Sequence, residues 1–281
     1  MYKILNKQNL NQYITLLEVY APFIAKKAKP GQFIIFRVDE KGERVPLTIA
    51  DFDREKGSIT IIFQVVGRST ELLANLDVGD YILDFVGPLG IPTHLDGVKK
   101  VAVVGGGVGC AIAYPQAKAL FNSGASVDVI AGFRNKDIVI LEEEFNAVSS
   151  RLFICTDDGS YKEKGLVTDV LKRLIDEGND YDLVIAIGPI PMMKYVSLTT
   201  KPYGIKTIVS LNPIMIDGTG MCGGCRVKVD QETKFACVDG PDFDGHVVDF
   251  DELMMRNSTY KKQEMLDKKH NCRLVGGIQN A

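Results

Sequence analysis

The sequence has little excess charge of either sign and no long apolar run. Each of these two absences argues against one class of function. Its 33 Lys and Arg are balanced by 36 Asp and Glu, giving a net charge of -3 and a pI near 5.7. No basic field is therefore available to neutralise a phosphate backbone, and we expect no nucleic-acid partner. The longest apolar stretch, residues 101–114, is Gly-rich and shorter than the roughly 20 residues that span a bilayer. The first residues turn polar too early for a signal peptide, so we expect a cytoplasmic protein without a membrane partner.

Recognisable acid–base machinery is also missing. The sequence shows no Ser-His-Asp arrangement and no H-E-x-x-H motif, and its three histidines, His94, His246 and His270, lie in predicted loops. We therefore predict no catalytic side chain, and we expect cofactors to supply the chemistry.

What is present indicates an ordinary globular protein of two domains with small appendages. The chain has 281 residues, of which 46% are hydrophobic and 25% charged. Residues 1–97 carry short β-rich segments separated by turns that contain Gly or Pro, a pattern that predicts a small antiparallel β-barrel. A helix over residues 69–76 is predicted to interrupt it, because Ser and Thr precede leucines at helical spacing.

Residues 98–212 have a different texture. Apolar strands at 101–104, 127–131, 152–155, 183–187 and 207–211 alternate with helical stretches. Such alternation predicts a parallel sheet covered by helices on both faces. Residues 213–247 then form a Gly- and Cys-rich segment, and residues 248–281 form a C-terminal helix and tail that is either a docking arm or part of the chain's own core.

The Cys-rich segment predicts a metal centre. It reads Asp217-Gly-Thr-Gly-Met-Cys222-Gly-Gly-Cys225, and Cys237 returns after a predicted hairpin. Two Cys three positions apart can bind one side of a centre and the third can close it, while the glycines leave N–H groups free for cluster sulfurs. The alternative is a structural zinc site in which His246 or Cys272 is the fourth ligand. A cluster is favoured because a zinc knuckle usually has a second close pair of ligands.

A glycine-rich turn predicts dinucleotide binding. It follows the strand at residues 101–104 and leads into a helix, where backbone and helix dipole can receive a pyrophosphate. The strict G-x-G-x-x-G pattern is not met, because Cys110 occupies its sixth position. The residues predicted to bind the dinucleotide are Gly105, Gly106, Gly107, Val108 and Gly109.

The choice between NAD and NADP stays open. Arg134 and Lys136 follow the second strand of this region and could receive a 2′-phosphate, yet one acid follows them directly and two more end the next strand. These acids are Asp137, Asp157 and Asp158.

Five segments in fixed order carry a family resemblance over essentially the whole chain. They are Arg44-Val-Pro-Leu-Thr48, Val66-Gly-Arg-Ser-Thr70, Gly87-Pro-Leu-Gly90, Gly106-Gly-Val-Gly-Cys-Ala111 and Gly188-Pro-Ile-Pro-Met-Met193. This order resembles the ferredoxin–NADP reductase superfamily. The resemblance implies an FAD-binding barrel followed by a nucleotide domain, with hydride passing between a nicotinamide and the flavin. The flavin-contacting residues it implies are Arg44, Pro46, Leu47, Thr48, Phe63, Gln64, Val65, Gly67, Ser69 and Thr70.

The position of the Cys segment narrows the resemblance to two families of electron-transfer subunits. One serves dihydroorotate dehydrogenase B, and the other serves NADH-dependent ferredoxin:NADP oxidoreductase. The first has a Cys five positions ahead of the C-x-x-C pair, whereas this chain has Asp217 there. The chain therefore looks more like the second, which implies a [2Fe–2S] cluster held by Asp217, Cys222, Cys225 and Cys237.

This resemblance implies a role in transferring electrons between NAD(H), FAD and the cluster. It also implies a heterodimer with a larger flavin and [4Fe–4S] subunit, which bifurcates electrons between NADPH, ferredoxin and NAD. Two alternatives remain. One is the electron-transfer subunit for dihydroorotate oxidation, and the other is a non-catalytic zinc-binding scaffold that has lost its flavin. The intact segment from Arg44 to Thr48 argues against the scaffold.

Overall fold

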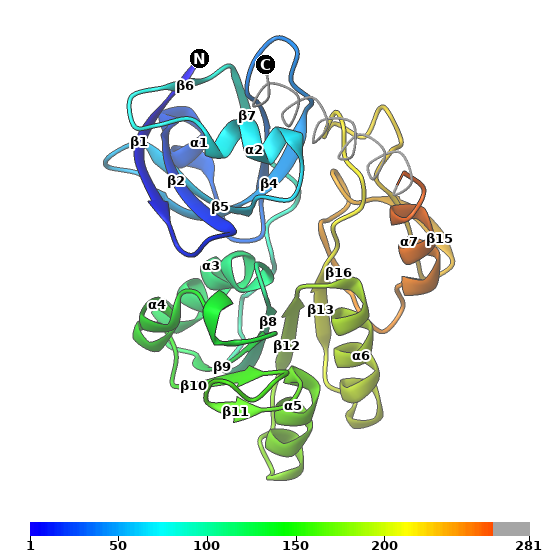
Figure 1. Cartoon of the computed structure of the whole chain (residues 1–281). Coiled ribbons are helices and arrows are strands. Elements are labelled where there is room, and N and C mark those ends of the chain that lie inside the picture. Colours follow the sequence, from blue (N-terminus) through cyan, green and yellow to red (C-terminus); the bar gives the residue numbers. More distant parts are fainter. Residues whose placement is uncertain (261–281) are drawn as a thin grey trace, which may run out of the picture.

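The computed structural model describes residues 1–260, and Figure 1 shows the arrangement of their elements. An N-terminal half-barrel lies above a parallel sheet with its helices, and a smaller segment lies beside both. Part of the predicted C-terminal tail, including His270 and Cys272, lies outside the described residues. Within residues 1–260, none of the helices combines the length and the apolar character that crossing a bilayer requires.

The N-terminal sheet is antiparallel and has the strand order β6-β1-β2-β5-β4-β3-β7. Its strands are β1 (Tyr2–Asn9), β2 (Ile14–Tyr20), β3 (Phe33–Arg37), β4 (Val45–Asp53), β5 (Ser58–Gln64), β6 (Tyr81–Ile82) and β7 (Asp84–Leu89). The sheet curls around a core of Ile, Leu and Phe side chains, including Phe36, Phe63 and Phe85. Helices α1 (Pro22–Lys27) and α2 (Arg68–Ala74) complete this unit, and α2 is the helix predicted at residues 69–76.

The second sheet has the order β11-β10-β9-β8-β12-β13-β16. Its parallel strands are β8 (Lys100–Gly106), β9 (Ser126–Phe133), β10 (Arg151–Thr156), β11 (Glu163–Lys164), β12 (Leu183–Ile187) and β13 (Thr207–Ser210). Because β8 lies between β9 and β12, the strand order reverses there, and ligands of such sheets bind at the carboxyl ends of the strands at this reversal. The five strands predicted from apolar runs are confirmed.

Helices cover both faces of this sheet, as predicted. Helix α3 (Gly109–Asn122) packs on one face, and α5 (Val167–Asp176) and α6 (Ile190–Thr200) pack on the other. The short α4 (Glu142–Ala147) lies beside α3, where Phe145 meets Tyr114 edge to face. Ile14, Ala50 and Ile62 of the half-barrel join the core under α3, so the two units share an apolar boundary.

The Cys-rich segment packs against both larger units. Its hairpin, β14 (Arg226–Val229) and β15 (Glu232–Phe235), turns through Asp230 and Gln231, which both have positive φ. Strand β16 (Asp242–Asp244) then pairs antiparallel with β13 at the edge of the larger sheet. Helix α7 (Phe250–Asn257) begins where the sequence predicts, and Asp249 caps it by accepting the Glu252 N–H at 3.0 Å.

Candidate cofactor and cluster sites

Two of the predicted cluster ligands, Cys225 and Cys237, lie together beneath the surface. Cys225 precedes β14 and Cys237 follows β15, so the hairpin returns the second thiol to the first. Their sulfurs are 3.2 Å apart, and each residue is 2% exposed. Burial, together with the hydrogen bond between the two thiols, raises the pKa of the Cys237 thiol to about 12. A bound metal would have to displace these protons, since only a thiolate is a good ligand.

The other two predicted ligands, Asp217 and Cys222, meet in the loop at the surface. One Asp217 oxygen accepts the Cys222 N–H at 2.9 Å, and the other accepts the N–H of Thr219 at 2.7 Å as well as its hydroxyl. These hydrogen bonds, the Thr219 hydroxyl first, lower the pKa of the Asp217 carboxyl. The carboxylate therefore closes the turn, yet Oδ2, which accepts a single hydrogen bond, keeps a lone pair that these bonds do not use.

The arrangement of donors fits a two-iron cluster better than a single ion. No group of three or more His, Cys, Asp or Glu side chains within residues 1–260 surrounds one metal position. A [2Fe–2S] cluster has two irons, each held by two protein ligands, which matches one buried pair and one surface pair. The His246 ring, proposed for a zinc site, instead lies 2.9 Å from the Thr200 hydroxyl at the end of α6.

The loop that carries these ligands rests on the half-barrel beside the predicted flavin segment. Arg44, next to the start of β4, donates from Nε to the Ile216 carbonyl at 3.2 Å. Gly218 has a φ of +79°, and a Cβ there would lie 2.7 Å from the Ile35 Cδ1 and 2.9 Å from the Leu89 Cδ1. The structure thus brings the residues predicted for flavin and for cluster next to each other, although they are far apart in the sequence.

The flavin segment lies where two strands of the half-barrel separate. The ladder between β4 and β5 begins at Ile49 and Ile61. Within the described chain, Pro46, Leu47 and Thr48 form no ladder with Phe63 and Gln64, which would be their continuation. Backbone groups here are available to a planar ligand. The Phe63 side chain is buried in the half-barrel core, so a contact from this residue would come from its backbone.

Beyond β5 the chain turns sharply into α2, and Thr70 holds this turn. Its hydroxyl accepts the N–H groups of Val66 at 3.0 Å and Gly67 at 3.1 Å, and it donates to the Gly67 carbonyl at 2.8 Å. Ser69 points to the outside and donates to the Glu43 carboxylate at 3.2 Å. Thr70 is therefore a structural element of the turn predicted to contact the flavin, and Ser69 and Val65 beside it are partly exposed.

The glycine-rich turn lies at the carboxyl end of β8, where the strand order reverses. Gly107 has a φ of +57° and open space where a Cβ would be, so it presents bare backbone. A Cβ on Gly109 would lie 2.4 Å from the Ile187 carbonyl oxygen, and one on Gly106 would lie 2.4 Å from the Met192 sulfur. Gly109 thus allows close packing against the end of β12 and Gly106 against the start of α6, while Gly107 and Val108 are partly exposed.

The residues that could distinguish NAD from NADP lie at the same edge of the sheet. Arg134 and Lys136 follow β9, while Asp157 and Asp158 follow β10. The Asp157 N–H donates to the Phe133 carbonyl at 3.0 Å, which ties the two strand ends together. Cations and carboxylates are thus interleaved here, as the sequence indicated.

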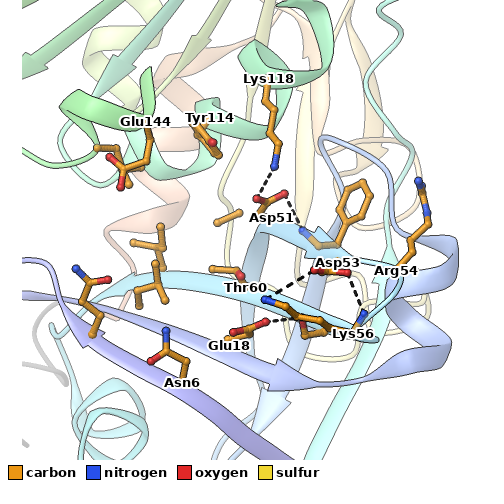
Figure 2. Close-up of a pocket in the computed structure, with 17 residues that line it drawn as sticks. Asn6, Glu18, Asp51, Asp53, Arg54, Lys56, Thr60, Tyr114, Lys118 and Glu144 are labelled. Atoms are coloured by element: carbon orange, nitrogen blue, oxygen red, sulfur yellow. Dashed lines mark hydrogen bonds and ion pairs between the residues drawn. The ribbon is translucent and has the colours of Figure 1, made fainter. Parts of the chain in front are cut away.

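A separate cavity of about 530 Å³ lies at the boundary between the half-barrel and α3 and α4 (Figure 2). Lys118 of α3 points across it to Asp51 of β4, with 2.6 Å between Nζ and Oδ2. Its other labelled side chains include Glu18, Asp53 and Glu144. None of the residues predicted to bind a cofactor lines it.

Comparisons with known proteins agree with this geometry. The family model for the iron–sulfur cluster binding domain of dihydroorotate dehydrogenase B matches residues 212–249. The dihydroorotate dehydrogenase B (NAD+) electron transfer subunit homolog of Thermotoga maritima is 44% identical over 274 residues, which is 98% of this chain and 96% of the relative. The electron transfer subunit of Geobacillus thermodenitrificans is 36% identical over 236 residues, covering 81% and 89%.

Solved structures show the same architecture. One chain in the structure of NADH-dependent reduced ferredoxin–NADP oxidoreductase, studied for flavin-based electron bifurcation, superposes with a TM-score of 0.91 at 43% identity. The match covers 97% of this chain and 98% of that one. The cytochrome P450 reductase GcoB of Amycolatopsis, at 19% identity and a TM-score of 0.61, shares the fold. The predicted ferredoxin-reductase-like fold with an iron–sulfur segment is confirmed.

Proposed function

Since this chain belongs to the family of dihydroorotate dehydrogenase B electron-transfer subunits and their homologues, we propose that it transfers electrons between NAD(H), FAD and a [2Fe–2S] cluster. It does so as the smaller subunit of an electron-bifurcating NADH-dependent ferredoxin:NADP oxidoreductase. The observation that carries this proposal is the contact of Arg44 with Ile216, because it joins the flavin segment to the cluster loop. When bound, a flavin exchanges hydride with a nicotinamide and single electrons with an iron–sulfur cluster.

The protein's own residues bind and orient these groups. The cluster would be held by Asp217 and Cys222 at the surface and by Cys225 and Cys237 beneath it. The flavin would be held by the separated ends of β4 and β5, with its pyrophosphate at the turn that Thr70 shapes. The dinucleotide would approach Gly107 and Val108 at the reversal of strand order, so that its nicotinamide reaches the boundary between the two units.

The surface around the cluster loop suits a protein partner. Met221, next to Cys222 in the sequence, is 89% exposed, Ile216 is 53% exposed and Val238 is 40% exposed. Ile216 packs near Gly224 and Val238 near Gly220, so both lie beside the loop that carries Cys222. Apolar side chains grouped beside an outlet for electrons are typical of a docking site. We assign this cluster-loop face, defined by Ile216, Met221 and Val238, to the larger flavin and [4Fe–4S] subunit, through which the chain serves ferredoxin indirectly.

Dihydroorotate oxidation is the second candidate, because the matched iron–sulfur domain model is named for that enzyme. Asp217 favours the first candidate, since the dihydroorotate subunits that this chain resembles carry Cys at the corresponding position.

The test is an assay of the native complex. The chain would be purified anaerobically from its natural source with its partner and assayed in parallel for two reactions. NADPH formation from NADP, reduced ferredoxin and NADH supports the proposal. NADH formation from NAD and dihydroorotate supports the second candidate, and failure of both rejects both functions.

A further inference from the structure

Asp242 lies at a junction where every major part of the chain meets. It begins β16, next to Ser210 of β13. Its Oδ2 accepts the Thr93 hydroxyl at 2.5 Å and the Gln116 Nε2 at 3.3 Å. Thr93 belongs to the connector between the two larger units and Gln116 to α3, so a single carboxyl group links three parts of the fold.

The half-barrel closes the fourth side of this junction. The Thr93 N–H donates to the Pro30 carbonyl at 3.0 Å. Gly31 has a φ of +86°, and a Cβ there would lie 2.1 Å from the Thr93 Oγ1 and 3.1 Å from the Asp242 Oδ2. A glycine at residue 31 is therefore what lets the half-barrel backbone approach the carboxyl group.

Two acceptor atoms at this junction have no donor. The Asp242 Oδ1 and the Gln116 Oε1 are buried, and neither finds a hydrogen-bond partner within residues 1–260. Gln116 is fully buried and its Nε2 already donates to Thr93 and to Asp242. Leaving a buried carboxylate oxygen without a donor is costly.

Among residues 1–260, no cation compensates for a charge here. The groups that face Asp242 from the connector, α3 and β13 are Thr93, Gln116 and Ser210, all uncharged. Lys118, two residues after Gln116 on α3, is paired with Asp51. The remaining titratable residues next along these elements, Lys29, His94 and Asp244, are exposed.

We propose that Asp242 is a protonated positioning residue, whose carboxylic acid fixes the half-barrel, the nucleotide-binding sheet and the Cys-rich segment relative to one another. The acid proton makes Oδ1 a donor and removes the charge that the junction leaves uncompensated, while Oδ2 continues to accept from Thr93 and Gln116. Burial raises the pKa of this carboxyl group above its ordinary value, more than the polar groups of Thr93, Ser210 and Gln116 that face it lower it.

The linkage between protonation and folding gives a signed prediction. Because the folded-state pKa is the higher one, stability from the proton is fully present below the unfolded pKa, near 3.9. It is lost as the pH rises through the folded-state pKa, at up to roughly tenfold in the folding equilibrium per pH unit. The contribution of Asp242 to the stability of the folded state therefore decreases as the pH rises.

Asp242→Asn provides the test, since an amide keeps one acceptor and places a permanent donor at the other position. Chemical denaturation of the whole chain would be followed from pH 5 to pH 8 for wild type, Asp242→Asn and Asp244→Asn. Asp244 is a matched control, because it is an exposed acid on the same strand. We expect the ratio of the folding constant of Asp242→Asn to that of wild type to rise with pH, by at most roughly tenfold per pH unit, until the pH passes the folded-state pKa of Asp242. The Asp244→Asn ratio should not rise.

A ratio for Asp242→Asn that stays constant with pH or falls would overturn the proposal, because it would mean that Asp242 is ionised throughout. A second readout is the rate at which NADH reduces a small electron acceptor through the protein. This readout depends on the proposed function, whereas the denaturation experiment does not. Asp242→Asn should keep the wild-type rate at pH 7. Asp242→Leu should lower it at least several-fold with bound flavin and iron unchanged. Equal rates in wild type, Asp242→Asn and Asp242→Leu would contradict the positioning role. They would not affect the conclusion from denaturation about the protonation of Asp242.

Discussion

Asp217 occupies a position in the cluster loop where a thiolate is expected from the dihydroorotate-type subunits. Its carboxylate already accepts hydrogen bonds from Thr219 and from the Cys222 N–H, so the structure is compatible both with ligation and with a purely structural turn. The two roles differ in what a thiol at this position would do. A ligand exchange changes the electronic structure of the cluster, whereas a turn residue acts only on loop stability.

We predict that Asp217→Cys retains the cluster but shifts its electron paramagnetic resonance spectrum, because the donor atom on one iron changes from oxygen to sulfur. Asp239→Asn is the matched control, since Asp239 also caps a turn of this segment by accepting the Phe235 N–H at 2.6 Å. Its spectrum should equal that of wild type. An unchanged spectrum in Asp217→Cys, with full iron content, would remove Asp217 from the ligand set.

Among single residues, the sequence identifies those whose partners lie close to them in the chain. The spacing of Cys222, Cys225 and Cys237 predicts that they meet through a hairpin, and the structure brings Cys225 and Cys237 together. Contacts between distant residues carry no such signal. Nothing in the sequence indicates that Arg44 reaches Ile216 or that Asp242 meets Thr93, because both contacts depend on how separate units pack.

In the turn between β8 and α3, Gly107 and Gly109 are glycines for different physical reasons. We predict that Gly109→Ala destabilises the protein by about 3 kcal/mol or more, because its Cβ would collide with the Ile187 carbonyl, a backbone atom that cannot give way. Gly107→Ala meets open space and costs only about 1 kcal/mol for its left-handed backbone.

Urea denaturation of both variants measures these costs. Gly107→Ala should also raise the KM for NADH, since the added methyl group faces the predicted pyrophosphate. Equal stability losses in the two variants, or a KM unchanged in Gly107→Ala, would contradict the roles assigned to this turn.

The start of α2 depends on one hydroxyl group. We predict that Thr70→Val lowers the free energy of unfolding by about 1–2 kcal/mol, because the N–H groups of Val66 and Gly67 lose their shared acceptor. The same variant should retain less FAD after gel filtration. Ser69→Ala, which loses only an exposed bond to Glu43, should change stability by less than about 0.5 kcal/mol. Comparable losses in both variants would contradict the role given to Thr70.

Elements with a clear apolar pattern in the sequence could be predicted, and elements without one could not. The parallel strands β8, β9, β10, β12 and β13 contain the apolar runs that are evident in the sequence. Strand β1 buries only Ile4 fully, so it lacks an alternating pattern. Strand β16 is three residues long and exists because β13 offers an edge for it to pair with.

Over the whole molecule, the half-barrel, the parallel sheet and the Cys-rich segment place the cluster loop at the outer surface (Figure 1). We predict that Met221→Glu abolishes or strongly weakens association with the larger subunit, because a charge would be buried in the centre of the cluster-loop face. Reduction of this chain's own cofactors by NADH should be unaffected.

Co-purification of the two subunits, followed by size-exclusion chromatography, measures the association. Phe23→Glu is a suitable control, because Phe23 is 86% exposed but lies on α1, away from the cluster loop in the sequence and the fold. Normal assembly of Met221→Glu would place the docking surface elsewhere.

The account as a whole depends on which groups the chain holds. The most direct measurement is metal and flavin analysis of the anaerobically purified chain, combined with electron paramagnetic resonance after addition of NADH. We predict one FAD and about two irons per chain, with a spectrum of a single reduced [2Fe–2S] cluster that appears on NADH addition. Zinc in place of iron, or a chain without flavin whose spectrum does not respond to NADH, would contradict the assignment as an electron-transfer subunit.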